Sequence, residues 1–232
     1  MSEEDAKKWV KSKVNQDKVV RQFFKDHKPH KNKLAFFMAG IPGAGKTEFA
    51  QNTINSIEQK LVPIEHDKLV EYIPGYKPEN YYNYRKAGSV LVSRILRECL
   101  NNSYGFIFDG TLSHEQGYKN IELSLKHGYF IQVVYIVQHA ETAWELTKDR
   151  ELVKKRSIQK DGFINTCNKL NKNLLDIFNR FKDNDKFGFW IFNKNGKIGT
   201  GEATSIIYSK GIGSAVDIEK GLTNSYNIEE LE

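Results

Sequence analysis

The sequence is poor in cysteine and has no long hydrophobic run. Its two cysteines, Cys99 and Cys167, lie far apart and form no C-x-x-C pair. This excludes a disulfide framework and a cysteine-based zinc site, and it suits a reducing cytoplasm. No apolar stretch approaches the roughly 20 residues that a membrane span needs. The first residues, MSEEDAKKW, also lack the apolar core of a secretory signal. We therefore expect a cytoplasmic protein with no membrane partner.

The chain also has only a small excess of one charge. Its 35 Lys and Arg against 29 Asp and Glu give a net charge of +6. Such a balance favours anionic ligands, of which nucleic acid is only one class. Because the cations are mixed with the anions and form no long basic stripe, nucleic acid ranks below small anionic ligands as the expected partner. With 28% charged and 12% aromatic residues, the 232 residues are typical of one large globular domain or a domain with appendages.

Short apolar runs alternate along the chain with segments of helical periodicity. The runs, expected to be buried strands, cover residues 34–39, 61–65, 106–108 and 131–137. The helical segments cover residues 47–60, 81–100, a stretch marked by Tyr118, Ile121 and Leu125, residues 140–156, and a longer helix around 167–181. This alternation predicts an α/β fold, a parallel sheet with helices on both faces.

The composition divides the chain into three parts. Residues 1–33 are expected to form a helical extension, with a helix over 3–27 and a polar loop over 28–33. Residues 34–200 form the main domain, which ends in a strand pair over 187–192 and 197–200 around a turn at 193–196. Residues 201–232 carry weak signals and are expected to be a weakly structured tail.

A complete phosphate-binding motif follows the first apolar run. The sequence GIPGAGKT matches G-x-x-x-x-G-K-[ST], between an expected strand and an expected helix. Glycines let backbone N–H groups approach phosphate oxygens closely, and the helix N-terminus adds positive potential. The Lys would reach the β- and γ-phosphates, and the Thr hydroxyl would bind Mg²⁺. We therefore predict a nucleoside triphosphate site formed by Gly40, Ile41, Pro42, Gly43, Ala44, Gly45, Lys46 and Thr47.

Two acidic residues are expected beside this site, because ligands of open α/β sheets bind beyond the carboxyl ends of the strands. Asp109 ends the run Phe-Ile-Phe and is placed either to assist Mg²⁺ or, with Thr111, to hold a substrate hydroxyl. Asp67 follows the second strand and is placed to take a proton from an attacking hydroxyl. The alternatives are an ordinary turn residue for Asp109 and a helix N-cap for Asp67. Glu65 and His66 are weaker candidates, and each could instead have a purely structural role.

Arginines are the third group of candidates. The cationic helix over 148–156 carries Arg150 and Arg156, and arginines that close over a γ-phosphate stabilise the charge that develops there. Most charges of this helix are expected to be simply solvated. Arg85 follows a tyrosine-rich loop and could hold a diphosphate, or it could face solvent as part of an amphipathic loop.

Taken together, these segments resemble the zeta-toxin family, P-loop kinases that phosphorylate UDP-N-acetylglucosamine. The resemblance covers residues 34–192 and consists of GIPGAGKT, EHD, NYR on the next helix, DGT, and an arginine-bearing helical lid. It implies a P-loop kinase domain that transfers the γ-phosphate of ATP or GTP to the 3′-hydroxyl of the amino sugar. It also implies a small helical antitoxin, encoded separately, as the partner.

The resemblance further implies a role for each motif residue. Lys46 and Thr47 would serve phosphates and Mg²⁺, and Asp67 would be the general base. Asp109 and Thr111 would hold the sugar nucleotide, Arg85 would contact its diphosphate, and Arg150 and Arg156 would face the γ-phosphate. The sequence departs from the family in having Asp109 where Glu is usual, and Ser113 and His114 where an arginine is often found. These departures concern the acceptor more than the donor.

Two other functions remain open at this point. A kinase of the same layout could phosphorylate an antibiotic hydroxyl or a polynucleotide 5′-end. A nucleotide-dependent switch or binding module would instead have no acceptor, and would hydrolyse nucleotide slowly whatever sugar is added.

Overall fold

The computed structural model describes residues 2–155, 158–194, 204–223 and 226. A six-stranded sheet crosses the molecule in the order β2-β3-β1-β4-β5-β6. The strands are β1 (Leu34–Ala39), β2 (Val62–Glu65), β3 (Phe106–Asp109), β4 (Phe130–Val137), β5 (Phe187–Asn193) and β6 (Thr204–Ser209). The first five run parallel, and β6 pairs antiparallel with β5. The predicted α/β fold is confirmed.

The central strands are continuous apolar runs because both of their faces are covered. In β1, Phe37 and Met38 are both fully buried although they point to opposite faces of the sheet. Phe37 pairs with Phe108 of β3 on one side and with Val133 of β4 on the other. Such burial on both faces is typical of parallel sheets covered by helices.

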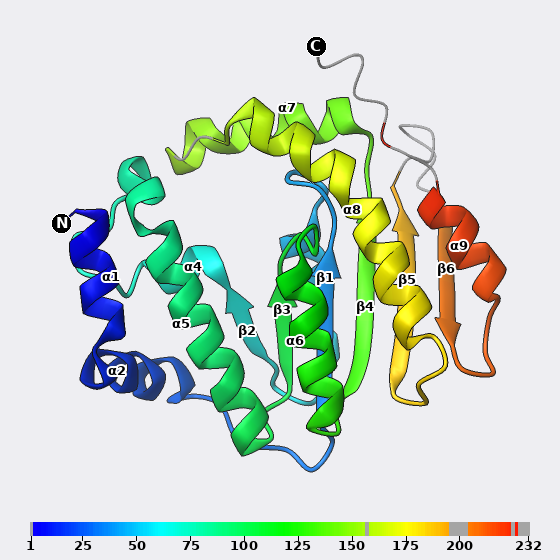
Figure 1. The fold of residues 1–232 in the computed structure, drawn as a ribbon, viewed down its shortest axis with the longest axis horizontal. Coiled ribbons are helices and arrows are strands. Elements are labelled where there is room, and N and C mark those ends of the chain that lie inside the picture. Colours follow the sequence, from blue (N-terminus) through cyan, green and yellow to red (C-terminus); the bar gives the residue numbers. More distant parts are fainter. Residues whose placement is uncertain (1, 156–157, 195–203, 224–225, 227–232) are drawn as a thin grey trace.

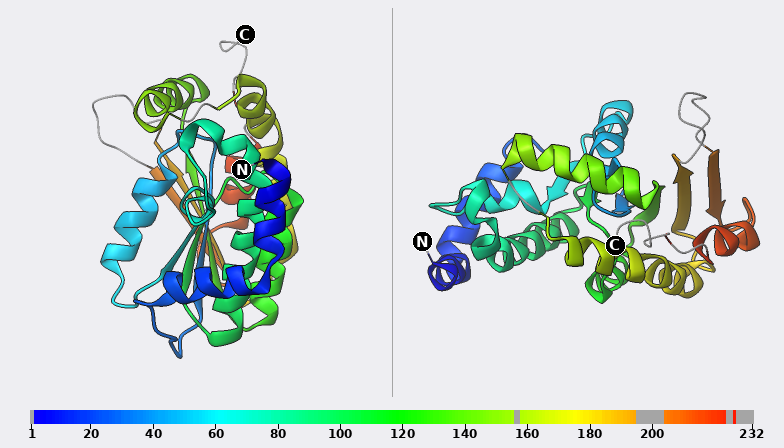
Figure 2. Two further views of the ribbon diagram at one scale, coloured as in Figure 1. Left: turned by 90° about the vertical axis from the view of Figure 1, so that its left-hand side faces the viewer. Right: turned by 90° about the horizontal axis from the view of Figure 1, so that it is seen from above.

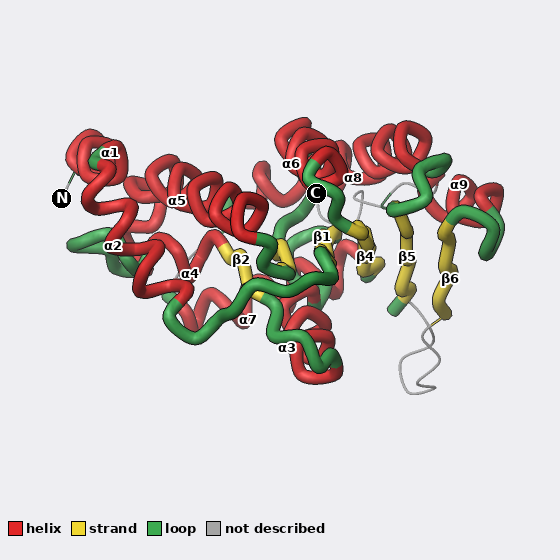
Figure 3. The backbone as a smooth tube through the Cα atoms, turned by 90° about the horizontal axis from the view of Figure 1, so that it is seen from below, coloured by secondary structure: helices red, strands yellow, loops and turns green. Residues whose placement is uncertain are grey.

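Helices surround this sheet (Figure 1), and the side view in Figure 2 shows them on both of its faces. They are α1 (Glu3–Lys11), α2 (Lys13–Phe24), α3 (Lys46–Ser56), α4 (His66–Val70), α5 (Tyr81–Asn102), α6 (Glu115–Lys126), α7 (Ala140–Lys154), α8 (Lys160–Phe181) and α9 (Ala215–Thr223), with a 3-10 turn at Pro78–Asn80. Figure 3 shows α5, α6, α8 and α9 on one face and α3 on the other. None of the helices among the described residues is both long and apolar enough to cross a membrane.

Helix α7 crosses one edge of the sheet, as the view from above in Figure 2 shows. This is the edge at which β1, β2 and β3 end, because these strands run in the same direction. β1 leads there into residues 40–45 and then α3, β2 leads directly into α4, and β3 ends at Asp109. The predicted motifs therefore meet at one edge of the fold.

The N-terminal segment is two helices rather than the single one predicted over 3–27. The chain is extended at Ser12, whose N–H donates to the carbonyl of Trp9. The side chains of Asn15 and Gln16 donate to the carbonyls of Trp9 and Val10, at 2.9 and 2.6 Å. These side chains satisfy carbonyls that a continuous helix would have used, so α1 ends there. Both helices pack against α5.

The C-terminal segment also differs from the weakly structured tail that the sequence suggested. β6 extends the sheet at β5, and α9 packs with Ile218 and Leu222 buried. Pairing along β5 supplies hydrogen bonds that no local sequence signal reveals. The predicted second strand over 197–200 lies outside the described residues. The division of the chain at residues 33 and 200 into separate units remains a prediction.

Candidate active site

Two cavities open at the edge of the sheet where β1, β2 and β3 end. The first has a volume of about 380 Å³ and is lined by the phosphate-binding loop, α4, the end of β3 and α7. The second, of about 240 Å³, lies between α5 and the segment that leads into α6. His66, Asp109, Gly110 and Thr111 line both cavities. The two cavities thus share a wall that carries three of the residues considered from sequence.

The phosphate-binding loop has the backbone that its glycines permit. Gly43 has a φ of +81°, and a Cβ there would collide with the carbonyl oxygen of Ala143 on α7. A residue with a side chain would therefore be strained and would also push α7 away. The Lys46 ammonium donates to the carbonyls of Gly40 and Ile41, at 3.0 and 2.8 Å. The loop thus holds the amine inside the first cavity, where phosphate oxygens would be its stronger partners.

Burial lowers the pKa of Lys46 to about 8, because the charged amine loses water that the carbonyls replace only in part. The nearby carboxylate of Asp109 opposes this shift, whereas Arg150 adds to it. A triphosphate between these cations would restore the balance of charge. The site is therefore electrostatically suited to a highly charged anion.

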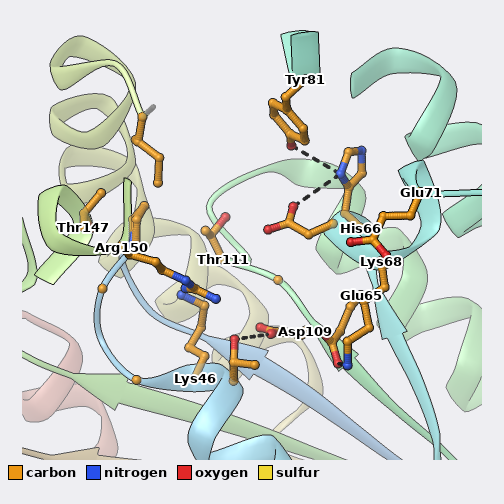
Figure 4. A pocket seen from close by; sticks show the side chains of 17 residues that line it. Lys46, Glu65, His66, Lys68, Glu71, Tyr81, Asp109, Thr111, Thr147 and Arg150 are labelled. Atoms are coloured by element: carbon orange, nitrogen blue, oxygen red, sulfur yellow. Dashed lines mark hydrogen bonds and ion pairs between the residues drawn. The ribbon is translucent and has the colours of Figure 1, made fainter. Parts of the chain in front are cut away.

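Thr47 and Asp109 form a direct contact across the sheet edge. The Thr47 hydroxyl donates to the Asp109 carboxylate at 2.9 Å (Figure 4). A hydroxyl and a carboxylate are hard oxygen donors, which Mg²⁺ prefers, and the ion commonly takes one or two such ligands together with phosphates and water. No cluster of three or more His, Cys, Asp or Glu that could cage a metal occurs in the part of the chain that the structure describes. The pair therefore fits Mg²⁺ brought with a nucleotide.

Asp67 lies in the first turn of α4 and lines the same cavity as Lys46 and Asp109. Its side chain is 47% exposed, so it can meet a ligand. His66, the residue before it, places Nδ1 3.8 Å from the Asp67 carboxylate. Glu65, the other weak candidate, pairs with Lys68 at 2.6 Å. Asp67 and the phosphate-binding loop thus line one cavity, and the role of Asp67 as general base stays a prediction.

Helix α7 covers the phosphate-binding loop and carries one of the two predicted lid arginines. Arg150 lines the first cavity, and Figure 4 shows its guanidinium directed toward Lys46. The helix is held down by close packing at Gly43 and by the Trp144 ring, 5.1 Å from that of Phe163 on α8. Arg156 lies outside the described residues.

Thr111 and Arg85 differ in their relation to the cavities. Thr111 lines both, and its hydroxyl is 2.8 Å from that of Ser113. The Arg85 side chain is exposed and lines neither cavity, although its backbone carbonyl contacts His66. The structure therefore brings together all the described candidates except the Arg85 side chain.

Sequence reasoning missed two residues at this site. Tyr81, at the start of α5, lines the first cavity, with its hydroxyl 3.3 Å from Nδ1 of His66. Lys194, which follows β5, has its ammonium 3.5 Å from the carbonyl oxygen of Ala44 in the phosphate-binding loop. Its position directly after an apolar strand was a usable signal, but the sequence interpretation assigned it to a turn.

Comparison with solved structures supports the fold. A structure of the PezAT chromosomal toxin–antitoxin system of Streptococcus pneumoniae has a TM-score of 0.66 at 16% identity, covering 95% of this chain and 92% of that one. A native AvrRxo1-ORF1:-ORF2 complex gives 0.65 at 15% identity, with 99% and 72% covered. The same complex with ATP gives 0.64 at 14% identity, with 96% and 71% covered. At these identities the likeness concerns the fold alone.

Sequence comparison identifies the family. No curated protein sequence matches the chain significantly. The family model described as zeta toxin, however, matches residues 18–199, which is most of the chain and includes the phosphate-binding loop, Asp67, Asp109 and α7. The family resemblance drawn from the motifs is thereby confirmed: this chain belongs to the zeta toxin family.

Proposed function

We propose that this protein is a Mg²⁺-dependent kinase that transfers the γ-phosphate of ATP to the 3′-hydroxyl of UDP-N-acetylglucosamine. The observation that carries the proposal is the placement of Asp67 in the same cavity as Lys46 and the Thr47–Asp109 pair. An exposed carboxylate in the donor cavity can act as general base toward an acceptor hydroxyl, and this supports transfer to an alcohol.

In the proposed reaction, the acceptor hydroxyl gives its proton to the Asp67 carboxylate as its oxygen forms a bond to the γ-phosphorus. The bond from that phosphorus to the β–γ bridging oxygen breaks, and ADP leaves. Lys46 and Arg150, which both line the first cavity, would stabilise the negative charge that develops on the transferred group. Thr47 and Asp109 would hold Mg²⁺, which neutralises charge on the β- and γ-phosphate oxygens when bound.

The second cavity supports a sugar-bearing acceptor. Its lining combines an apolar floor, which includes Ile64, Val92 and Phe108, with hydroxyl and amide side chains such as Ser93, Gln116 and Asn120. No lysine or arginine of the described residues lines it. Such a surface suits an uncharged group that is rich in hydroxyls and amides, because these can hydrogen-bond to the hydroxyl and amide side chains of the lining. The shared wall at Asp109 and Thr111 would then bring that group to the donor cavity.

The described lining of the second cavity offers no lysine or arginine for the diphosphate of the acceptor. The assignment of Arg85 to this diphosphate stays a prediction, since its side chain is exposed outside both cavities. The assignment of Arg156 to the γ-phosphate also stays a prediction. GTP remains an alternative donor.

The proposed partner is a small helical antitoxin that blocks the nucleotide site. The PezAT system is a toxin–antitoxin system, and an AvrRxo1-ORF1:-ORF2 complex has been solved with ATP. We extend both features to this chain as part of the proposal, with the cytoplasm as the place of action. The two buried free cysteines accord with that compartment.

The test is incubation with labelled ATP, Mg²⁺ and a panel of sugar nucleotides, followed by identification of the products. We expect phosphorylated UDP-N-acetylglucosamine from the wild type, and none from Asp67→Asn, which should still bind ATP. Asp26→Asn, at an exposed carboxylate remote from the cavities, is the matched control and should react like the wild type. Transfer to another hydroxyl would overturn the acceptor. Hydrolysis alone, unaffected by any sugar nucleotide, would overturn the kinase.

A further inference from the structure

His66 is held between the candidate base and helix α5. Its Nε2 is 2.9 Å from the carbonyl oxygen of Arg85, and its Nδ1 is 3.3 Å from the hydroxyl of Tyr81. The same Nδ1 is 3.8 Å from the carboxylate of Asp67 (Figure 4). The ring therefore contacts α5 through both nitrogens while one of them also faces Asp67.

These partners determine which nitrogen carries the proton. A backbone carbonyl can only accept a hydrogen bond, so Nε2 must be the donor toward Arg85. In the neutral ring Nδ1 is then unprotonated and accepts from the Tyr81 hydroxyl. The side of the imidazole that faces Asp67 thus presents a lone pair, with no N–H.

Helix α5 can pack this closely against the His66 ring because it has a glycine, Gly88, at the point of contact. A Cβ on Gly88 of α5 would lie 2.8 Å from Nε2 of His66 and would collide with Val70 of α4. The two helices approach one another closely only because residue 88 has no side chain. His66 is consequently fixed by α5 as well as by its own helix, and its Nδ1 cannot move far from Asp67.

We propose that His66 is a positioning residue that orients Asp67 and increases its basicity, an inference that rests on the proposed role of Asp67. When the acceptor hydroxyl gives its proton to Asp67, the resulting carboxylic acid becomes a donor. The lone pair on Nδ1 then accepts from this acid in place of the Tyr81 hydroxyl, whose contact is 3.3 Å long, after the 3.8 Å separation from Asp67 shortens to about 2.8 Å. This contact stabilises the protonated form of Asp67 and so favours removal of the proton from the acceptor.

The two ring nitrogens of His66 have different roles: Nε2 binds the Arg85 carbonyl and Nδ1 faces Asp67. A substitution can remove one role and keep the other. The amide nitrogen of glutamine can replace Nε2 as donor to the Arg85 carbonyl, whereas glutamine has no counterpart of Nδ1. His66→Gln should therefore keep the link to α5 and lose the contact with Asp67. His30→Gln is the matched control, because the loop that carries His30 precedes β1 and lies at the opposite edge of the sheet.

We expect His66→Gln to lower kcat roughly tenfold, the effect of one hydrogen bond to an ionisable group, with KM for both substrates and the unfolding temperature unchanged. In the Asp67→Asn background the same substitution should cause no further loss of whatever residual transfer a sensitive assay detects, since the base that His66 serves is absent. His30→Gln should match the wild type. A wild-type kcat for His66→Gln, or an equal loss in both backgrounds, would overturn the positioning role.

A measurement on the wild-type protein tests the geometry without reference to activity. Nitrogen NMR of ¹⁵N-histidine-labelled protein, assigned by comparison with His66→Gln, should show His66 protonated at Nε2 in its neutral form. A proton on Nδ1 would overturn this inference while leaving the proposed kinase intact. Conversely, if the wild type phosphorylates no acceptor, the proposed function fails and the positioning role fails with it.

Discussion

The hydroxyl of Thr47 donates to the carboxylate of Asp109 at 2.9 Å, although the two residues are 62 positions apart in the sequence. Thr47 lies in the first turn of α3, which continues from the loop after β1, and Asp109 is the last residue of β3. Because β1 and β3 are parallel neighbours, both residues reach the same edge of the sheet. The contact links the triphosphate motif to the wall that both cavities share.

This contact predicts that Asp109→Asn weakens ATP binding only when Mg²⁺ is present. The amide is a poorer ligand for a hard cation than a carboxylate, so the metal should no longer improve affinity. We expect a loss of about tenfold or more in Mg²⁺ and no loss in EDTA, measured by isothermal titration calorimetry. Asp185→Asn, an exposed carboxylate before β5, is the control. Equal weakening in both buffers would contradict a metal-linked role for Asp109.

The lowered pKa of Lys46 predicts a stability that rises with pH in the free protein. Since the pKa is about 8 in the fold and 10.5 in its absence, the unfolded chain binds more protons between these values. The cost of the buried charge is therefore fully present below pH 8 and is relieved as the pH rises toward 10.5. Lys46→Met should raise the unfolding free energy by about 1–3 kcal/mol at pH 7, and the gain should vanish above pH 10.5. Denaturant titrations at several pH values test this.

The same amine predicts how nucleotide affinity depends on pH. A bound triphosphate favours the charged form, so the affinity for ATP should fall as the pH rises through about 8, where Lys46 of the free protein loses its proton. Lys46→Met should bind ATP weakly at every pH. An ATP affinity that stays constant from pH 7 to 9 in the wild type would show that Lys46 does not titrate in this range.

Arg150 on α7 should affect turnover more than binding. Its guanidinium points into the first cavity, where an arginine stabilises charge that develops on the transferred phosphoryl group (Figure 4). Arg150→Ala should lower kcat by about 10²–10³-fold and change the Kd for ATP far less. The matched control is Lys148→Ala, which removes a cation of the same helix. The Lys148 ammonium lies over the Trp144 ring, and its loss should change kcat by less than about twofold. Similar effects of the two substitutions would indicate a general charge effect of α7.

Two glycines in helices should respond in opposite directions to alanine. Gly88 of α5 faces His66 and Val70 at close range, so Gly88→Ala should force α4 away and destabilise the protein by about 1–3 kcal/mol. Gly162 of α8 has nothing near its missing Cβ, so Gly162→Ala should stabilise the protein by roughly 0.5 kcal/mol through helix propensity. Chemical denaturation measures both. A stabilised Gly88→Ala would mean that α4 and α5 do not approach as described.

The local sequence determined the parts of this protein whose physics is local. The apolar runs before GIPGAGKT and before Asp109 had to be buried, and strands buried on both faces imply a parallel sheet covered by helices. The glycines of the loop and the Lys-Thr pair that follows were sufficient to predict the phosphate site. All of these residues lie within one short segment, so their spacing in the sequence fixes the conformation of the loop. Asp67 and Asp109 each lie at or just after the carboxyl end of a predicted parallel strand, so the sequence also predicted both at the same edge of the sheet.

Tertiary structure alone decided what depends on contacts between distant segments. The hydroxyl of Tyr81, which contacts His66 of α4, belongs to α5. The close approach of α4 to α5 depends on the absence of a side chain at Gly88. The exposed position of the Arg85 side chain follows from which face of α5 is turned to the protein. Residues Thr204–Ser209 form the strand β6 because their backbone pairs with the outer side of β5. Such contacts are stabilised by residues far away in the sequence. A short segment therefore does not contain all the residues whose interactions favour them, and local patterns cannot predict them.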